Sequence, residues 1–200
     1  MELNNRYFLL RHGQTIYQKE KIDINYPPDS PDELEITEEG REMVRASAEQ
    51  LKDTCAEQGR SINVIFASPY LRTRESASIA AEIIGIKEVY YDDRLTDINL
   101  GEFLGRPMSE SLNFYSSGKD PFNSKPKNGE SWNDILERIE SFIVDVEKRY
   151  KNKNILVVSH ADPIWILAGY LRGYKTEEEF LKARKDRENC YPRVGQLIKV

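Results

Sequence analysis

The chain has 200 residues, enough for one domain with a real buried core, and its 39% apolar content is typical of a globular protein. A net charge of −5 argues against a nucleic-acid-binding surface, and the apolar stretches are far shorter than a membrane span. The two cysteines, Cys55 and Cys190, have no metal-ligand spacing. We therefore expect free thiols, no zinc site and a cytoplasmic protein.

Five short apolar runs along the chain predict β-strands. The stretches between them have the periodicity of amphipathic helices, so strands and helices alternate. Such alternation predicts βαβ units in an α/β fold, a three-layer α/β/α sandwich with a mostly parallel central sheet. We predict a single domain over residues 1–200, with 92–130 as a surface excursion that can form a lid or substrate loop. The predicted strands are residues 6–10, 62–67, 88–91, 154–158 and 194–200.

Capping residues mark the predicted starts of four helices. Ser68 and Asp162 are each followed by proline, which is favoured at the first helical position. Two glutamates follow Thr37 in the first turn, where their negative charges interact favourably with the positive end of the helix dipole. Ser131 and Asp134 have a spacing similar to that of a capping box.

The C-terminal part of the chain predicts two further features. Gly173 is expected to end the helix that starts near Asp162, because glycine readily adopts the left-handed conformation of a helix end. Residues 175–188 carry opposite charges at helical spacing. We interpret this segment as a solvated helix.

Both histidines of the chain stand at the ends of predicted strands. His12 follows Arg11 after the first strand, and His160 ends the fourth. Ser68 ends the second strand and opens the helix that carries Arg72 in its first turn. Because parallel strands place their ligand sites beyond their carboxyl ends, these residues are predicted to meet at one rim. Each feature alone is weak, but their conjunction indicates an anion site.

Two histidines, several arginines and no metal-ligand cluster suit phosphoryl transfer. Arginine forks neutralise phosphate oxygens, and a neutral imidazole can attack phosphorus to give a phosphohistidine. The leaving oxygen also needs a proton, which a carboxylic acid can supply. The spacing leaves four acids open after the third strand: Asp92, Asp93, Asp97 and Glu102.

Six ordered motifs carry a family resemblance that covers nearly the whole chain. They are "LLRHGQT", "ITEEGREMVRASAEQL", "ASPYLRTRESA", "LTDINLGEFLG", "NGES" and "VVSHADPI". Through them the chain resembles the histidine phosphatase superfamily, also called the phosphoglycerate mutase-like family. The resemblance implies a phosphoglycerate mutase-like fold and chemistry that needs neither a metal nor another cofactor.

The resemblance also implies roles for individual residues. His12 would accept the phosphoryl group, and Asp97 would act as the acid and base, with Glu102 in reserve. Asp97 stands where many members have glutamate, and Gln18 occupies a position often held by asparagine. The residues implied to bind phosphate are Arg11, Gln18, Arg72, His160 and Ala161.

Within the family the chain is predicted to be a phosphatase. Mutases carry a longer segment with an RHYG-type motif after the acid, and residues 92–130 contain none. A mutase is the alternative, and a non-catalytic phosphate-binding module is a third hypothesis. The expected partner is a small phosphorylated metabolite, with no nucleic acid or membrane, and the chain is expected to be a monomer or a homodimer.

The substrate pocket is expected along residues 14–36 and 92–130. These segments contain several aromatic and basic side chains, although the aromatic ones suit core or loop packing equally well. The candidates are Tyr17, Tyr26, Phe103, Phe114, Tyr115, Lys119 and Lys125.

Overall fold

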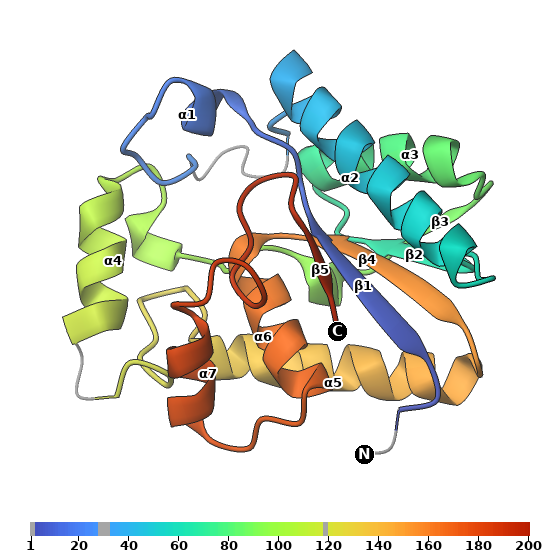
Figure 1. The fold of residues 1–200 in the computed structure, drawn as a ribbon. Helices are drawn as coiled ribbons and strands as arrows, with labels where there is room; N and C mark the ends of the chain where they lie inside the picture. The colour runs from blue at the N-terminus through green and yellow to red at the C-terminus, as the bar shows by residue number, and fades with distance from the viewer. Residues whose placement is uncertain (1–2, 28–32, 118–119) are drawn as a thin grey trace.

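A five-stranded sheet forms the middle of the computed structural model, which describes residues 3–27, 33–117 and 120–200 (Figure 1). The strand order is β3-β2-β4-β1-β5, and all neighbouring pairs are parallel except β1 with β5. The last strand is shorter than predicted. The strands are β1 (Arg6–Arg11), β2 (Val64–Ala67), β3 (Val89–Tyr91), β4 (Asn154–Ser159) and β5 (Leu197–Lys199).

Helices cover both faces of the sheet, which confirms the predicted three-layer α/β/α architecture (Figure 1). Alternate side chains of β1 enter different cores, as the two-residue period of a strand requires. Phe8 and Leu10 pack with α2 and α3, whereas Tyr7 and Leu9 pack with α5 and α6. The covering helices are α2 (Glu38–Glu57), α3 (Leu71–Ile84), α5 (Trp132–Arg149) and α6 (Ala161–Leu171).

Two of the four predicted helix caps are confirmed. The Thr37 hydroxyl accepts the Gly40 N–H at 3.0 Å, and Ser131 forms a full capping box with Asp134. The Ser68 cap is wrong, because its hydroxyl lies 2.9 Å from a ring nitrogen of His160 and the helix begins later, at Leu71. A capping residue therefore fails to cap its helix when its side chain binds another group, as Ser68 does with His160.

The Asp162 cap is also wrong, since α6 begins at Ala161, two residues earlier than that pattern implies. β4 ends at Ser159, and the next residue, His160, already has the extended backbone of an N-cap. Asp162 and Pro163 consequently lie in the first turn, where a missing N–H costs no hydrogen bond. Gly173 follows the end of α6 with φ of +83°, as predicted.

The remaining elements are short helices and turns outside the sheet and its four covering helices. Residues 92–117 and 120–130 form short turns and helix α4, which lies to one side of the sheet (Figure 1). No helix in the described part of the chain is long and apolar enough to cross a membrane. These elements are α1 (Ile16–Lys19), the 3-10 turns η1 (Asp93–Leu95) and η2 (Gly101–Phe103), α4 (Met108–Ser117) and α7 (Glu177–Ala183).

The prediction of a solvated helix over residues 175–188 is wrong in two respects. Helix α7 ends at Ala183, and both Phe180 and Ala183 are buried against α6. Beyond the end of the helix the Asp186 side chain accepts the N–H groups of Glu188 and Asn189 in a turn. The chain after α7 therefore folds back onto the molecule.

Candidate active site

Three strand ends bring the predicted residues together at the carboxyl edge of the sheet. Register pairs Arg11 of β1 with Ser159 of β4, so His12 and His160 leave adjacent strands side by side. Their ring centroids are 5.3 Å apart, and both side chains are buried. Ser68 follows β2 and contacts His160. The parallel sheet thus places these groups on one site, as the strand-end argument predicts.

Glycine after His12 is required by the close approach of helix α2. A β-carbon on Gly13 would fall 2.5 Å from the carbonyl oxygen of Gly40. Helix α3 also holds this loop, because the Gly13 N–H donates to Ser76 Oγ at 3.0 Å. His12 Nδ1 lies 2.8 Å from the Gly13 carbonyl oxygen, which can only accept, so Nδ1 carries the hydrogen. The lone pair of the imidazole therefore resides on Nε2.

Arg72 occupies the first turn of α3 and is fully buried. Its Nη2 donates to Asp97 Oδ2 at 3.1 Å. Its guanidinium lies 4.7 Å from the centre of the Tyr26 ring and 5.0 Å from that of Tyr70. These cation–π contacts from two rings restrict the orientation of the guanidinium.

Burial and positive charge keep both imidazoles neutral. Desolvation lowers the pKa of His12 well below its usual 6.5, and Arg72 and Arg11 lower it further. The pKa of His160 is also well below 6.5, again chiefly from burial and then from Arg72. Arg11 is half-buried, and its Nη1 donates to the Pro192 carbonyl at 3.0 Å. The site therefore presents neutral ring nitrogens beside fixed cations, which suits an incoming anion.

Of the four candidate acids, the structure brings only Asp97 to this cluster. Its Oδ2 lies 3.5 Å from His160 Nδ1 as well as 3.1 Å from Arg72 Nη2. Glu102 is exposed and accepts the Lys127 N–H at 3.1 Å, away from the histidines. The other two are also directed elsewhere: Asp92 pairs with Arg94, and Asp93 is exposed.

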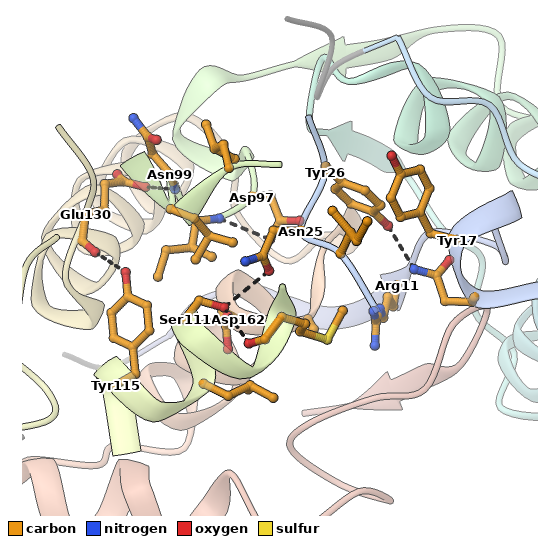
Figure 2. Close-up of a pocket in the computed structure, with 18 of the residues that line it drawn as sticks. Arg11, Tyr17, Asn25, Tyr26, Asp97, Asn99, Ser111, Tyr115, Glu130 and Asp162 are labelled. Atoms are coloured by element: carbon orange, nitrogen blue, oxygen red, sulfur yellow. Dashed lines mark hydrogen bonds between the residues drawn. The ribbon is translucent and has the colours of Figure 1, made fainter. Parts of the chain in front are cut away.

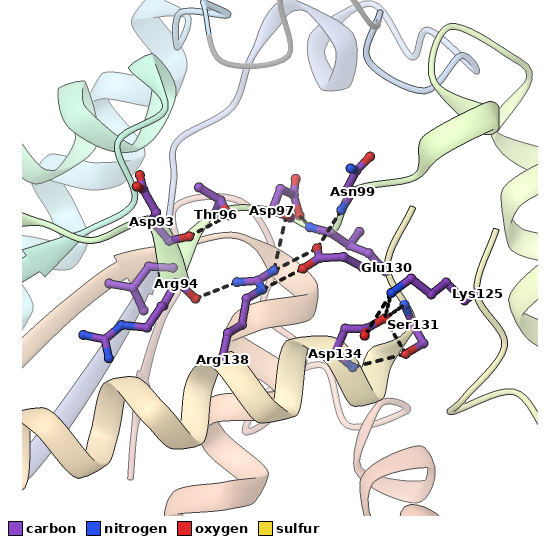
Figure 3. Close-up of polar contacts among 12 residues, drawn as sticks. Asp93, Arg94, Thr96, Asp97, Asn99, Lys125, Glu130, Ser131, Asp134 and Arg138 are labelled. Carbon is purple, nitrogen blue, oxygen red and sulfur yellow. Dashed lines mark hydrogen bonds and ion pairs between the residues drawn. The ribbon is translucent and has the colours of Figure 1, made fainter. Parts of the chain in front are cut away.

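The segment that carries Asp97, residues 92–104, is called the acid loop here, and α5 holds it in place (Figure 3). Arg138 Nη1 donates to the Arg94 carbonyl at 2.6 Å, and Nη2 lies 3.4 Å from the Asp97 carbonyl. Glu130 binds Arg138 and accepts the Asn99 N–H at 2.9 Å. Sequence reasoning marked the "NGES" stretch only as a helix start and missed this support.

A cleft of about 900 Å³ opens in front of the cluster and is lined by His12, Arg72 and Asp97. Figure 2 shows Arg11, Tyr17 and Tyr26 across this cavity from Tyr115 and Glu130. Tyr17, Tyr26 and Tyr115 therefore line the pocket, as predicted. The other predicted aromatic residues, Phe103 and Phe114, pack against each other instead, with their ring centroids 5.3 Å apart.

The remaining predicted residues are placed as follows. Gln18 lines the cleft, but its amide nitrogen donates to the Tyr26 hydroxyl at 2.8 Å. Ala161 lines the cleft at the first position of α6. Lys125 forms an ion pair with Asp134 at 3.0 Å. Lys119 and residues 28–32 lie outside the described residues.

Arg184 lines the cleft, although sequence reasoning assigned it to a solvated surface. Its guanidinium lies 4.7 Å from the centre of the Trp132 ring and 5.1 Å from that of Tyr191. Its Nε is 3.7 Å from Asp162 Oδ1, and burial raises the pKa of that carboxyl. No local signal distinguishes this arginine from the exposed charged residues near it in the chain, because its partners come from distant segments.

No group of three or more His, Cys, Asp or Glu side chains that could hold a metal ion occurs within residues 3–27, 33–117 and 120–200. Cys55 and Cys190 are both free and buried.

Neutral histidines, arginines and a carboxylate lie together at the carboxyl edge of the parallel sheet of this α/β protein, an arrangement that suits an anionic ligand. The chain belongs to the histidine phosphatase superfamily (branch 1), whose family model matches residues 7–185. This confirms the resemblance carried by the sequence motifs.

Proteins similar to this chain include both phosphatases and mutases. Phosphoserine phosphatase 1 of Hydrogenobacter thermophilus is 27% identical over 65% of this chain and 61% of its own length. The 2,3-bisphosphoglycerate-dependent phosphoglycerate mutase of Thermoplasma acidophilum is 29% identical, over 86% of this chain and 78% of its own. A mycobacterial glucosyl-3-phosphoglycerate phosphatase has the same fold, with a TM-score of 0.69, 23% identity, and coverage of 88% of this chain and 83% of its own.

Proposed function

We propose that this protein is a metal-independent phosphatase that hydrolyses a small phosphomonoester through a phosphohistidine on His12. The observation that carries the proposal is the neutral His12 ring, whose Nδ1 is held by the Gly13 carbonyl, at the wall of a cleft beside two arginines. That arrangement leaves Nε2 with a lone pair, and a neutral nitrogen is the form that can attack phosphorus.

In the proposed first step, His12 Nε2 forms a bond to phosphorus and the bond to the leaving oxygen breaks. Asp97, in its protonated form, gives its proton to that oxygen, so a neutral alcohol departs. Arg72 and Arg11 neutralise the phosphoryl oxygens, and His160 completes their contacts. In the second step a water attacks phosphorus, the P–N bond breaks, and the Asp97 carboxylate takes a proton from the water.

Phosphoryl transfer of the mutase type is the second candidate, because the similar proteins include a phosphoglycerate mutase. It shares the first step and differs in the acceptor of the phosphoryl group. Release of inorganic phosphate supports hydrolysis, whereas its transfer to a second hydroxyl supports the mutase.

We predict that p-nitrophenyl phosphate is hydrolysed at the same rate with and without EDTA. Vanadate is expected to inhibit competitively, because it adopts the five-coordinate geometry of the reacting phosphorus and suits the arginine–histidine cluster. The measurement is release of p-nitrophenolate and inorganic phosphate. Loss of activity in EDTA with recovery on adding magnesium or zinc contradicts the metal-free mechanism.

We predict that Asp97→Asn harms alkyl phosphates much more than p-nitrophenyl phosphate. An alkoxide is a poor leaving group and needs a proton, whereas p-nitrophenolate leaves without one, and general-acid help is worth ~10²–10⁴-fold. The measurement is the single-turnover rate of the phosphorylation step with each substrate. Glu102→Gln is the matched control, because Glu102 lies on the same loop but contacts Lys127.

Equal losses on the two substrates would reduce Asp97 to a positioning role. A selective loss in Glu102→Gln would move the acid to Glu102 and contradict the assignment made from the distances.

A further inference from the structure

Three buried polar atoms without hydrogen-bond partners lie together in the wall of the cleft, next to the proposed phosphate site. They are Trp132 Nε1, Asp162 Oδ1 and Arg184 Nε. All three residues line the cleft, and the Trp132 side chain is 3% exposed. Figure 2 labels Asp162 among the residues that line the cavity. Buried polar atoms normally have partners, so a cluster without them at a cleft indicates a place for a ligand group.

The charges of the described cleft lining are balanced. The lining holds four cations, Arg11, Lys21, Arg72 and Arg184, and four carboxylates, Asp23, Asp97, Glu130 and Asp162. A second charged group on a substrate would therefore meet lining charges of both signs.

Only one of these cations lies both near the proposed phosphate site and outside it. Arg11 and Arg72 belong to that site, and Lys21 is exposed at the rim. Arg184 is the remaining one, and Asp162 faces it at 3.7 Å. Asp162 itself is only two residues beyond His160, and Arg11 and Asp97 both influence its pKa. A carboxylate on the substrate would therefore meet an arginine that is already neutralised and an acid that repels it.

A hydroxyl group suits this pair better than a carboxylate does. It can donate to the Asp162 carboxylate and accept from the N–H of Trp132 or Arg184, so it satisfies groups of both kinds. A site whose buried polar groups match a hydroxyl discriminates strongly against analogues that leave those groups unpaired.

We propose that the Asp162–Arg184 pair is a specificity determinant that makes this cleft select phosphate esters of neutral, hydroxylated alcohols over esters that carry a carboxylate. The inference rests on the proposed phosphatase function and names its substrate class. It also argues against phosphoglycerate as the natural substrate.

The test compares glycerol 3-phosphate with 3-phosphoglycerate, which differ by a hydroxymethyl group in place of a carboxylate. For each variant the measured quantity is the ratio of kcat/KM for the first substrate to that for the second. The wild-type ratio is expected to exceed one. Asp162→Asn leaves Arg184 without its partner and should lower the ratio about tenfold or more, since charge-assisted hydrogen bonds are strong.

Arg184→Met is expected to change the ratio in the opposite direction. It keeps an apolar stem between the aromatic rings but removes the cation that faces Asp162, so a carboxylate is repelled more strongly and the ratio rises. The double variant should return toward the wild-type ratio. Asp23→Asn is the matched control, because it removes a lining carboxylate at the exposed rim and should change the ratio less than about twofold.

General damage to the fold cannot produce opposite shifts in two single variants, so the ratio separates specificity from stability. Ratios that move in the same direction, or stay constant in Asp162→Asn and Arg184→Met, overturn the inference while p-nitrophenyl phosphate turnover still supports the phosphatase. A wild-type preference for 3-phosphoglycerate overturns it as well. Absence of any turnover by the wild type overturns the proposed function and this inference with it.

Discussion

Replacing His12 with alanine is expected to reduce phosphatase activity by ~10³-fold or more, since the proposed covalent step uses the Nε2 lone pair of His12. The variant should remain folded. The His12 ring makes one side-chain hydrogen bond, to the adjacent Gly13 carbonyl, and the strand and loop are held by backbone bonds to Ser159 and by Ser76. Activity on p-nitrophenyl phosphate and a denaturant unfolding curve check both parts.

A second measurement places the phosphoryl group on the protein. Rapid quenching with a labelled phosphomonoester should trap label that is lost in acid and retained in base, as expected for phosphohistidine. His160→Gln is the matched control, because it alters the neighbouring imidazole and keeps His12 in place. It should react slowly yet still acquire the label. Label or ordinary turnover in a folded His12→Ala protein would assign the nucleophile elsewhere.

Arg72→Lys is expected to lose about 10²–10³-fold in kcat/KM although the positive charge is kept. The guanidinium is fully buried, lies against the rings of Tyr26 and Tyr70, and binds Asp97 through Nη2. A lysine ammonium is a single point charge on a flexible stem. It cannot keep these contacts and also hold phosphate oxygens in the geometry of a fork.

Arg74→Lys is the control for that prediction. Arg74 lies on the same helix, but its guanidinium rests 5.4 Å from the centre of the Tyr91 ring, outside the cleft. Its activity should stay within about twofold of the wild type, as for most surface changes. Vanadate inhibition measured in parallel should weaken only in Arg72→Lys. If Arg74→Lys is the damaged variant, the phosphate site lies on the other side of α3.

The alternation of strands and helices, the parallel sheet and the meeting of the two histidines are all readable in the sequence. Local patterns determine them: apolar runs of strand length, amphipathic periods, and polar residues directly after the strands. Once the sheet is parallel, its carboxyl ends must share an edge, so His12, Arg72 and His160 converge. The caps at Thr37 and Ser131 were equally local, because each hydroxyl binds an N–H within its own first turn.

The choice of Asp97 from four nearby acids required the tertiary structure. Its position depends on Arg138 and Glu130, which come from around helix α5 and hold the acid loop by its carbonyl and N–H groups. Spacing along the chain carries no information about such contacts.

The same holds for Arg184, whose charged neighbours predict a solvated helix, and for Asp162, whose proline neighbour predicts a cap. Their ion pair and the aromatic rings around it bring together α5, α6 and the chain after α7. Because burial and charge compensation arise only when distant segments pack, the tertiary structure alone decided that this pair faces the cleft.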